Sequence, residues 1–532
     1  DIDANVTTLG GAFTATGASV FDSSGKDIAT SGAVDTAGGA VTITTGTGDL
    51  TTGPIYARGG LVTSGAGAAG GAVTLNSAGT LNVYGLIDTQ GSAGGSNAGG
   101  AGGAIGLTGA NSIVHSGTIR TAGGSGSTVG AGGDVAFNSD TLWNFDLSVS
   151  TGAGAGDITY AGALDSVSRA AYDITLTAGT GDIIFAGAVG NTWALDAVTI
   201  NSAGTVDADG VFKAASFTQS AGSVLTQFDG AVTLSGAFDF TGQALTLNAA
   251  LSGSTVEVTN AGTLTTAATG DITSAGTFTQ NSTGGNRLAG DITTTNSNIS
   301  FLRAVTLTGP VALSTGSGAG DVTFSSTIDG AQALSLTAGT GDVTFTDLVG
   351  DTTPLGELTI SSVADVTANG IRAAALVQTA GSGTTTLNSG TFASGVSYLY
   401  GTAPATQALF TTGYNNSTKG INLHAGTISI AGRVDQAGGS SVPLVLNAGS
   451  GGLSIGADID ANGSPSLTGG GSGISIGAQI RSAGGSITLN SPVLLTAATT
   501  LDSGVGTGDI TLSGTVDGAQ SLTLAAGTGG ID

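Results

Sequence analysis

Residues 321–342, DVTFSSTIDGAQALSLTAGTGD, are written again with few changes at residues 509–530, DITLSGTVDGAQSLTLAAGTGG. The offset between the two copies is 188 positions, without a gap. A looser copy begins at Asp157 and carries four extra residues before it reaches Asp182. One short pattern therefore recurs along the chain, and it predicts a repeat architecture rather than a set of unrelated domains.

Three short runs within residues 321–342 alternate apolar and polar side chains, which is the pattern of strands that bury one face. The runs are too short to form independent hairpins, so each needs a neighbouring strand above and below. We expect three strands and a Gly-Asp corner to make one coil of a stack. The inward-facing residues are predicted to be Val322, Phe324, Ile328, Leu334 and Leu336.

Related units, such as GGAVTL at 70–75 and GGSITL at 484–489, recur along the rest of the chain with connecting loops of very different length. A stacked solenoid tolerates such variation, because the strands must stay in register while the outward loops can grow. No sustained apolar stripe of helical period is present. The sequence predicts an all-β fold: a right-handed parallel β-helix with three short strands per coil, roughly 20–25 coils and little or no α-helix.

A longer repeat relates residues 174–200 to residues 334–360 at an offset of 160. The match continues before slipping by one residue near Lys213 and Arg372. It indicates duplication of a block of several coils.

Four segments follow from these patterns. Residues 1–150 are predicted to be solenoid with long Gly/Ala/Ser loops, and residues 151–395 regular solenoid with GTGD-type repeats. Residues 396–425 form an irregular excursion that contains aromatic residues. Residues 426–532 continue the solenoid to an end without a cap.

The composition excludes several classes of partner. The chain of 532 residues has 36 acidic and 11 basic residues and a formal net charge of −25. Nucleic acids and anionic membrane surfaces are disfavoured, because both are bound by Lys and Arg. No run approaches the roughly 18 apolar residues of a membrane span. There is no Cys for disulfides or thiolate metal sites, and the start at Asp1 is expected to be a processed end or a fragment boundary.

Gly-Asp pairs precede many of the predicted strands. The expected role is local: Gly supplies a positive φ at the corner, and the carboxylate accepts an N–H group two residues further on. The alternative is a ladder of carboxylates that binds structural Ca²⁺ between coils, with Asp182, Asp342 and Asp509 as ligands. No other metal or cofactor is expected.

Charged residues occupy one position of a recurring IDT/IRT motif, at Asp35, Asp88, Arg120, Asp435 and Arg481. Successive coils are expected to place opposite charges one strand apart and so help to fix the register. A catalytic interpretation, with Asp88 and Arg120 in a groove of the pectin-lyase kind, stays open beside it.

The two histidines, His115 and His424, lie too far apart in a linear fold to share a metal site or a catalytic triad. Each is expected to be an exposed strand or loop residue. Trp143 and Trp193 are expected to lie in strand-like runs and to pack there. No catalytic residue is assigned, and the chain is not expected to be an enzyme.

The excursion contains Tyr398, Tyr400 and Tyr414 in a chain that is otherwise poor in aromatic residues. These side chains are expected to cover the side of the coil stack. The functional alternative is an aromatic platform for the sugar ring of a glycan.

The units AGTGDVTF, AGAVG and the GGAVTL/IDT alternation resemble the repeats of large bacterial surface proteins of the filamentous haemagglutinin and autotransporter-adhesin type. The resemblance covers most of the chain. It implies secretion, a right-handed parallel β-helix, and work in adhesion, biofilm or cell-surface structure.

The leading hypothesis is an extracellular structural protein, a subunit or segment of a bacterial surface fibre whose copies stack head to tail. The strand pattern is unfinished at both ends, so the contacts between copies are predicted at Asp1, Ile2, Asp3, Ile531 and Asp532. The partners would then be copies of the chain and surface or matrix glycans. Two alternatives are a monomeric adhesin stalk within a much longer secreted polypeptide and a β-helix enzyme that acts on polysaccharides.

Overall fold

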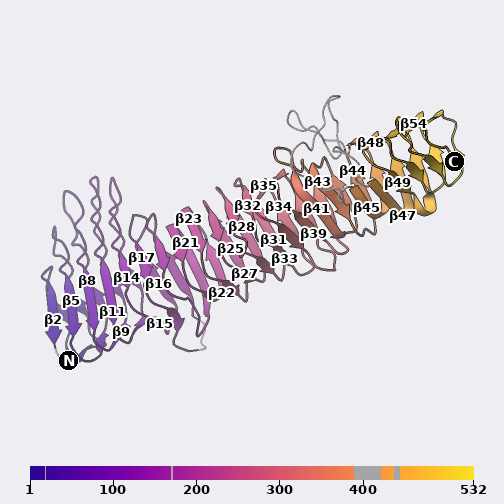
Figure 1. The fold of residues 1–532 in the computed structure, drawn as a ribbon. Coiled ribbons are helices and arrows are strands. Elements are labelled where there is room, and N and C mark those ends of the chain that lie inside the picture. Colours follow the sequence, from indigo (N-terminus) through magenta and orange to yellow (C-terminus); the bar gives the residue numbers. More distant parts are fainter. Residues whose placement is uncertain (18, 169–171, 389–420, 436–443) are drawn as a thin grey trace. The chain divides into compact units, whose positions relative to one another are not determined.

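The computed structural model describes the chain except for residues 18, 169–171, 389–420 and 436–443. Nearly all of its secondary structure is parallel β, and the chain winds into a β-solenoid of about 21 turns (Figure 1). Among the described residues, the only helix is a single 3-10 turn, η1 (Gly470–Ser472). The predicted fold class is confirmed. The chain divides into two compact units, residues 1–270 and 271–532, which are described separately.

The repeated stretch forms one coil, as predicted. Its strands are β37 (Val322–Phe324), β38 (Ile328–Asp329) and β39 (Leu334–Thr337). Each strand pairs in parallel with the corresponding strand of the next coil: β37 pairs with β40 (Val343–Phe345), and β39 pairs with β41 (Leu355–Ser362). The five predicted inward residues are all buried.

The first unit has the same organisation. Two successive coils are β8 (Val73–Ser77), β9 (Thr80–Tyr84) and β10 (Ile87–Asp88), then β11 (Ile105–Gly109), β12 (Ser112–Ser116) and β13 (Ile119–Arg120). The middle strands build a sheet of six. Its members in spatial order are β18 (Leu164–Ser166), β15 (Thr141–Trp143), β12, β9, β6 (Leu50–Thr52) and β3 (Phe21–Ser23).

The second unit contains a comparable sheet of five strands. They are β46 (Val434–Asp435), β48 (Ile459–Ala461), β51 (Gln479–Ser482), β54 (Thr499–Asp502) and β57 (Leu522–Ala525). All pairings in this sheet are parallel.

The core is a set of columns in which like residues of successive coils lie on one another. In the second unit, Phe278, Phe301, Phe324 and Phe345 form one such column, with ring centroids 5.2, 5.4 and 5.5 Å apart. Burying each Phe contributes about 1.5–3 kcal/mol. Because each coil touches only its neighbours, stability is spread along the column rather than concentrated in one core.

The predicted duplication is visible in the interior. Thr226 donates a hydrogen bond of 2.9 Å to the buried side chain of Gln219, and Thr385 donates one of 2.7 Å to Gln378. The two pairs lie 159 positions apart, which is the predicted offset of 160 after the slip of one residue. The duplicated sequence therefore builds the same interior contact twice.

A buried hydroxyl closes the base of many outward loops. The hydroxyl donates to the carbonyl oxygen of a glycine at the far side of the loop, as in Thr89 to Gly103 and Thr151 to Gly156. The first bond spans 14 residues and the second spans 5. Loop length therefore varies between coils while the strands on either side keep their register, as predicted.

The long loops of the first unit are stacked on one another (Figure 1, indigo to purple). The glycine layer is formed by loop residues 31–39, 58–71, 90–103 and 122–133, whose backbones hydrogen-bond both across each loop and to the next loop, as from Gly100 to Ser92 and from Gly99 to Thr128. A Cβ added at Gly100 would lie 2.1 Å from the carbonyl oxygen of Ala68. The backbones approach so closely that only glycine fits, as at the crowded axis of collagen.

Candidate functional site

The Gly-Asp carboxylates bond the next coil rather than their own turn. Oδ1 of Asp182 accepts the N–H of Thr205 at 2.7 Å, and Oδ1 of Asp342 accepts the N–H of Asp365 at 3.0 Å. Oδ1 of Asp509 accepts the N–H of Gly530 at 2.7 Å. The prediction that each carboxylate accepts the N–H two residues further along its own turn is therefore wrong. The carboxylate projects along the stack toward the following coil instead.

The glycine of each Gly-Asp pair also has a different role from the one expected. Gly179 and Gly339, which lie two residues earlier, carry the positive φ of 61°. A Cβ at Gly181 would lie 2.3 Å from the carbonyl oxygen of Gly156, and one at Gly341 would lie 2.2 Å from that of Gly320. Close contact with the preceding coil therefore requires these glycines.

This geometry bears on the Ca²⁺ hypothesis. One oxygen of each of the three carboxylates, Asp182, Asp342 and Asp509, is already occupied by a backbone N–H. Each of these carboxylates has a structural role that needs no ion, because it links two coils through a charge-assisted hydrogen bond.

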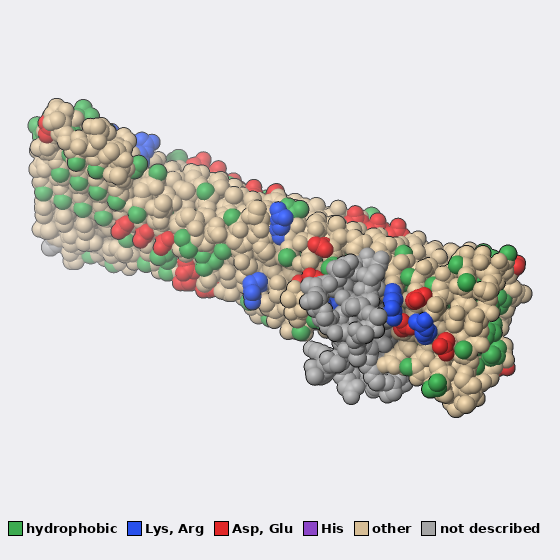
Figure 2. Space-filling view, turned by 90° about the horizontal axis from the view of Figure 1, so that it is seen from above, with side chains coloured by type: hydrophobic (Ala, Val, Ile, Leu, Met, Phe, Trp, Pro, Cys, Tyr) green, Lys and Arg blue, Asp and Glu red, His purple; other side chains and the backbone are tan. Residues whose placement is uncertain are grey.

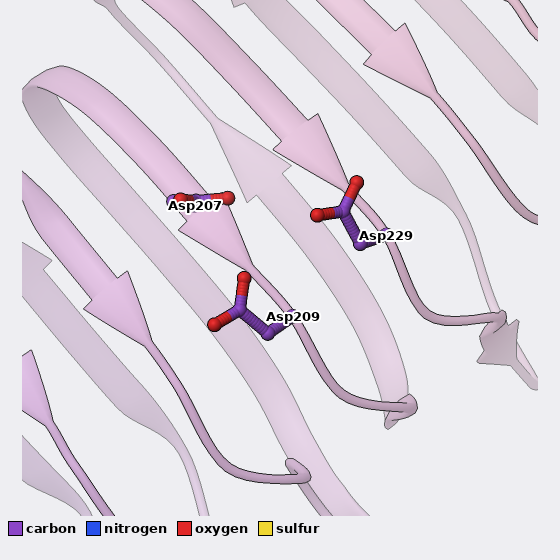
Figure 3. A group of neighbouring side chains, drawn as sticks. All are labelled: Asp207, Asp209 and Asp229. Carbon is purple, nitrogen blue, oxygen red and sulfur yellow. The ribbon is translucent and has the colours of Figure 1, made fainter.

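A different group of carboxylates has the spacing of a cation site. One oxygen each of Asp207, Asp209 and Asp229 lies within 4.8 Å of the others (Figure 3). Asp207 is half-buried near the end of β21 (Leu195–Ala208), and Asp209 follows that strand. Asp229 follows β23 (Gly222–Phe228) on the next coil. Carboxylate oxygens are the ligands that Ca²⁺ and Mg²⁺ prefer.

The electrostatics of this group are unfavourable without a counterion. Burial raises the pKa of Asp207, and the charges of Asp209 and Asp229 raise that pKa further. One Asp207 oxygen, Oδ1, is buried without a hydrogen-bond partner. Asp229 is better supported, because its Oδ1 accepts hydrogen bonds from Asn248 at 2.6 Å and from Gln227 at 3.0 Å.

Sequence reasoning missed this group, although the signal was present. Asp207 stands opposite Gln227 in the register of β21 and β23, so Asp209 falls opposite Asp229. Aligning VDADG at 206–210 with TQFDG at 226–230 would have brought the three carboxylates together.

The predicted charge register holds in β10 and β13, where Asp88 stands opposite Arg120. The ion pair of Asp88, however, is with Arg58 of the preceding coil. Asp88 is completely buried, whereas the side chain of Arg58 is 46% exposed and Arg120 is exposed. A carboxylate enclosed in this way is not presented to a substrate in a groove.

In the second unit, Asp460 forms ion pairs with Arg433 and Arg481 of the two flanking coils. This alternation of charge agrees with the prediction that opposite charges on successive coils help to fix the strand register. Asp35, by contrast, lies in a turn with a φ of 62° and not in a strand. Its carboxylate accepts the N–H of Thr63. Assigning Asp35 to the strand motif was therefore wrong, and the side chain of Asp435 lies outside the described residues.

His115 is fully buried in β12, so the expectation of an exposed side chain is wrong. Its ring packs against Trp143 at a centroid distance of 5.3 Å and against Phe137 at 6.0 Å. Burial lowers the pKa of His115 to about 3. His424 is half-buried in β45 (Ile421–Ile430), with Nδ1 3.2 Å from the amide nitrogen of Asn447.

The tryptophans differ from each other. Trp143 is buried in a strand and packs as predicted. Trp193 lies in a bend before β21, so its assignment to a strand was wrong. The proposed glycan-contact residues Tyr398, Tyr400 and Tyr414 lie outside the described residues.

The terminal residues show where the outer strands pair. The Ile2 N–H donates to the carbonyl oxygen of Asp22, and Ile531 forms a parallel bridge with Ile510. Asp1, Asp3 and Asp532 are exposed. Ile2 and Ile531 therefore bond to the neighbouring coil.

Acidic side chains are spread over the face of the molecule shown in Figure 2, and basic ones are few there. Among the described residues, no helix is both long and apolar enough to cross a membrane. Comparison of the chain with protein-family models, with curated proteins and with solved structures gives no match.

Proposed function

We propose that the chain is an extracellular structural protein: a β-solenoid segment of a bacterial surface fibre whose coils stack end to end and support adhesion or matrix. The observation that carries the proposal is that one set of contacts joins each coil to the next. The parallel strand pairs, the columns of stacked interior side chains and the Gly-Asp carboxylates all recur at the coil spacing. A surface that repeats in this way can accept a further coil by the same contacts.

The last strand of the second unit illustrates such a surface. Within the part of the chain that the structure describes, β57 pairs with β54 and with no other strand. Leu522 and Leu524 are half-exposed, whereas the residues opposite them in β54, Thr499 and Leu501, are buried. A following coil would cover these leucines and pair with the free edge of β57. That coil could belong to the same polypeptide or to a second copy.

Two further observations bear on the proposal. The repeats resemble those of large secreted surface proteins, and the excess of acidic residues keeps a surface rich in small apolar side chains soluble. In this proposal the chain acts through contact area and length rather than through chemistry, and its partners are copies of itself and surface glycans.

Electron microscopy and sedimentation of the 532-residue chain at increasing concentration test the stacking. We expect filaments whose diffraction shows a repeat of about 4.8 Å, the distance between stacked strands. Replacing Leu524 by Lys should shorten or abolish them, because it places a charge in the contact. Thr523→Lys is the matched control, since Thr523 is exposed on the same strand.

A monomer at every concentration and salt condition would refute stacking between copies. The stalk alternative is distinguished by the mass of the native polypeptide. A native mass far above 50.3 kDa would place the next coil in the same chain.

A further inference from the structure

The interior of the first unit contains a row of polar side chains. In the six-stranded sheet, Ser23, Thr52, Val83, His115 and Trp143 stand opposite one another on successive strands. All five are at most 1% exposed. Four of the five carry polar side-chain atoms. Buried threonines in other columns, such as Thr89 and Thr151, donate hydrogen bonds to backbone carbonyl oxygens.

The polar atoms of this row lack partners in the described part of the chain. They are the hydroxyls of Ser23 and Thr52, both ring nitrogens of His115 and Nε1 of Trp143. Tyr160, whose ring centroid is 6.3 Å from that of Trp143, adds a buried hydroxyl that likewise has no partner. We call Ser23, Thr52, His115, Trp143 and Tyr160 the interior seam.

So many unpartnered groups in one place point to a ligand. A buried donor or acceptor without a hydrogen bond destabilises the folded state, and native proteins rarely keep such groups unsatisfied. Ser23 and Thr52 are also shorter than the Leu, Ile and Phe residues that fill neighbouring columns. We expect a ligand to lie beside these shorter side chains.

The chemistry of the seam identifies the ligand class. The indole of Trp143 only donates, a neutral imidazole such as His115 donates at one nitrogen and accepts at the other, and the hydroxyls of Ser23, Thr52 and Tyr160 do both. A cation would leave the donors unsatisfied, and an anion would leave the acceptors unsatisfied. An apolar guest would satisfy neither. Water donates and accepts, and buried waters typically make about three hydrogen bonds to such groups.

We propose that the interior seam of the first unit binds a file of ordered water molecules, which bridge His115 to Trp143 and Tyr160 and extend toward Thr52 and Ser23. The seam is thus a hydration site in the interior of the solenoid. It is independent of the stacking of coils proposed above.

The test uses the full chain with Trp193→Phe, which leaves Trp143 as the only tryptophan. With a ¹⁵N-labelled indole, a bound water should give a cross-relaxation peak of negative sign between the Nε1 proton of Trp143 and the water signal. A crystal structure of the same variant should show density within about 2.7–3.2 Å of Nε1 and of a ring nitrogen of His115.

A second variant separates binding from simple accessibility. Adding His115→Phe should weaken the water peak at least threefold, because it removes the bridge. Ile113→Val is the matched control, since it alters the same buried strand without removing a polar atom. Absence of the water peak in the single variant, with no density beside the indole, would overturn the proposal, whether or not the His115→Phe protein folds.

Discussion

Acidification should open the coils around His115 before it affects the rest of the chain. The pKa of this histidine is lowered from 6.5 to about 3, because burial opposes the charged form. Between these values the unfolded chain binds a proton that the folded chain excludes. Stability is therefore present above pH 6.5 and is lost as the pH falls toward 3.

The magnitude follows from the same two values. At about 1.36 kcal/mol for each pH unit, the full difference corresponds to about 5 kcal/mol. At pH 5 the loss relative to pH 7.5 should be about 2 kcal/mol, or a roughly 30-fold increase in the locally opened population. A few buried waters would satisfy the ring nitrogens but would not restore bulk solvation, so the direction stands.

Urea titration of the Trp193→Phe variant at pH 7.5, 6.5, 5.5 and 5.0 measures this loss through the fluorescence of Trp143, whose ring centroid is 5.3 Å from that of His115. Carboxylates of ordinary pKa titrate mostly below this range. His115→Phe should abolish the dependence. The reasoning would be wrong if the urea midpoint changed equally with pH in the proteins with and without His115. It would also be wrong if the midpoint did not change between pH 7.5 and 5.

Three further changes test other contacts. Asp342→Ala should weaken the link to the next coil by about 1 kcal/mol, seen as roughly fivefold faster hydrogen exchange at the Asp365 amide, and Asp342→Asn should restore most of the protection. Gly100→Ala should destabilise the glycine layer by about 1–3 kcal/mol and expose loop 90–103 to proteolysis, whereas Gly106→Ala, where a Cβ meets nothing within 4 Å, should not. Asp207→Asn should raise the free energy of unfolding at pH 7 by roughly 0.5 kcal/mol, because it removes a carboxylate whose raised pKa reflects burial and repulsion by neighbouring charges. That gain should shrink as the pH falls and Asp207 becomes protonated, and a destabilised Asp207→Asn protein would contradict the electrostatic argument.

The coils were predictable because their information is local. Alternation at Val322 and Phe324 gives one strand, and the distance of 21 residues between the Gly-Asp steps at Asp321 and Asp342 gives the coil length. The duplication was also readable, since the pairs Gln219–Thr226 and Gln378–Thr385 follow the predicted block.

The contacts between coils were not predictable to the same degree, because they depend on what lies one turn away. The sequence places Asp88 beside Thr89 but not beside Arg58, which belongs to the preceding coil. It shows His115 in an alternating run but not which phase of that run faces inward. The cluster at Asp207 required the register of two strands 20 positions apart.

The hydroxyl clamps at the loop bases have a consequence for how such a chain can change. Thr89 and Thr151 close loops of very different length with the same bond from a hydroxyl to a glycine carbonyl oxygen, which we call the clamp. The coils therefore tolerate residues inserted in the loop beyond the clamp. Each clamp marks a grafting point at which a foreign peptide could be displayed at a fixed interval, while the coils below continue to fold as before. Such insertion sites recur along the chain at the spacing of the coils. The hydrogen bonds between coils set this spacing, and the inserted peptide does not.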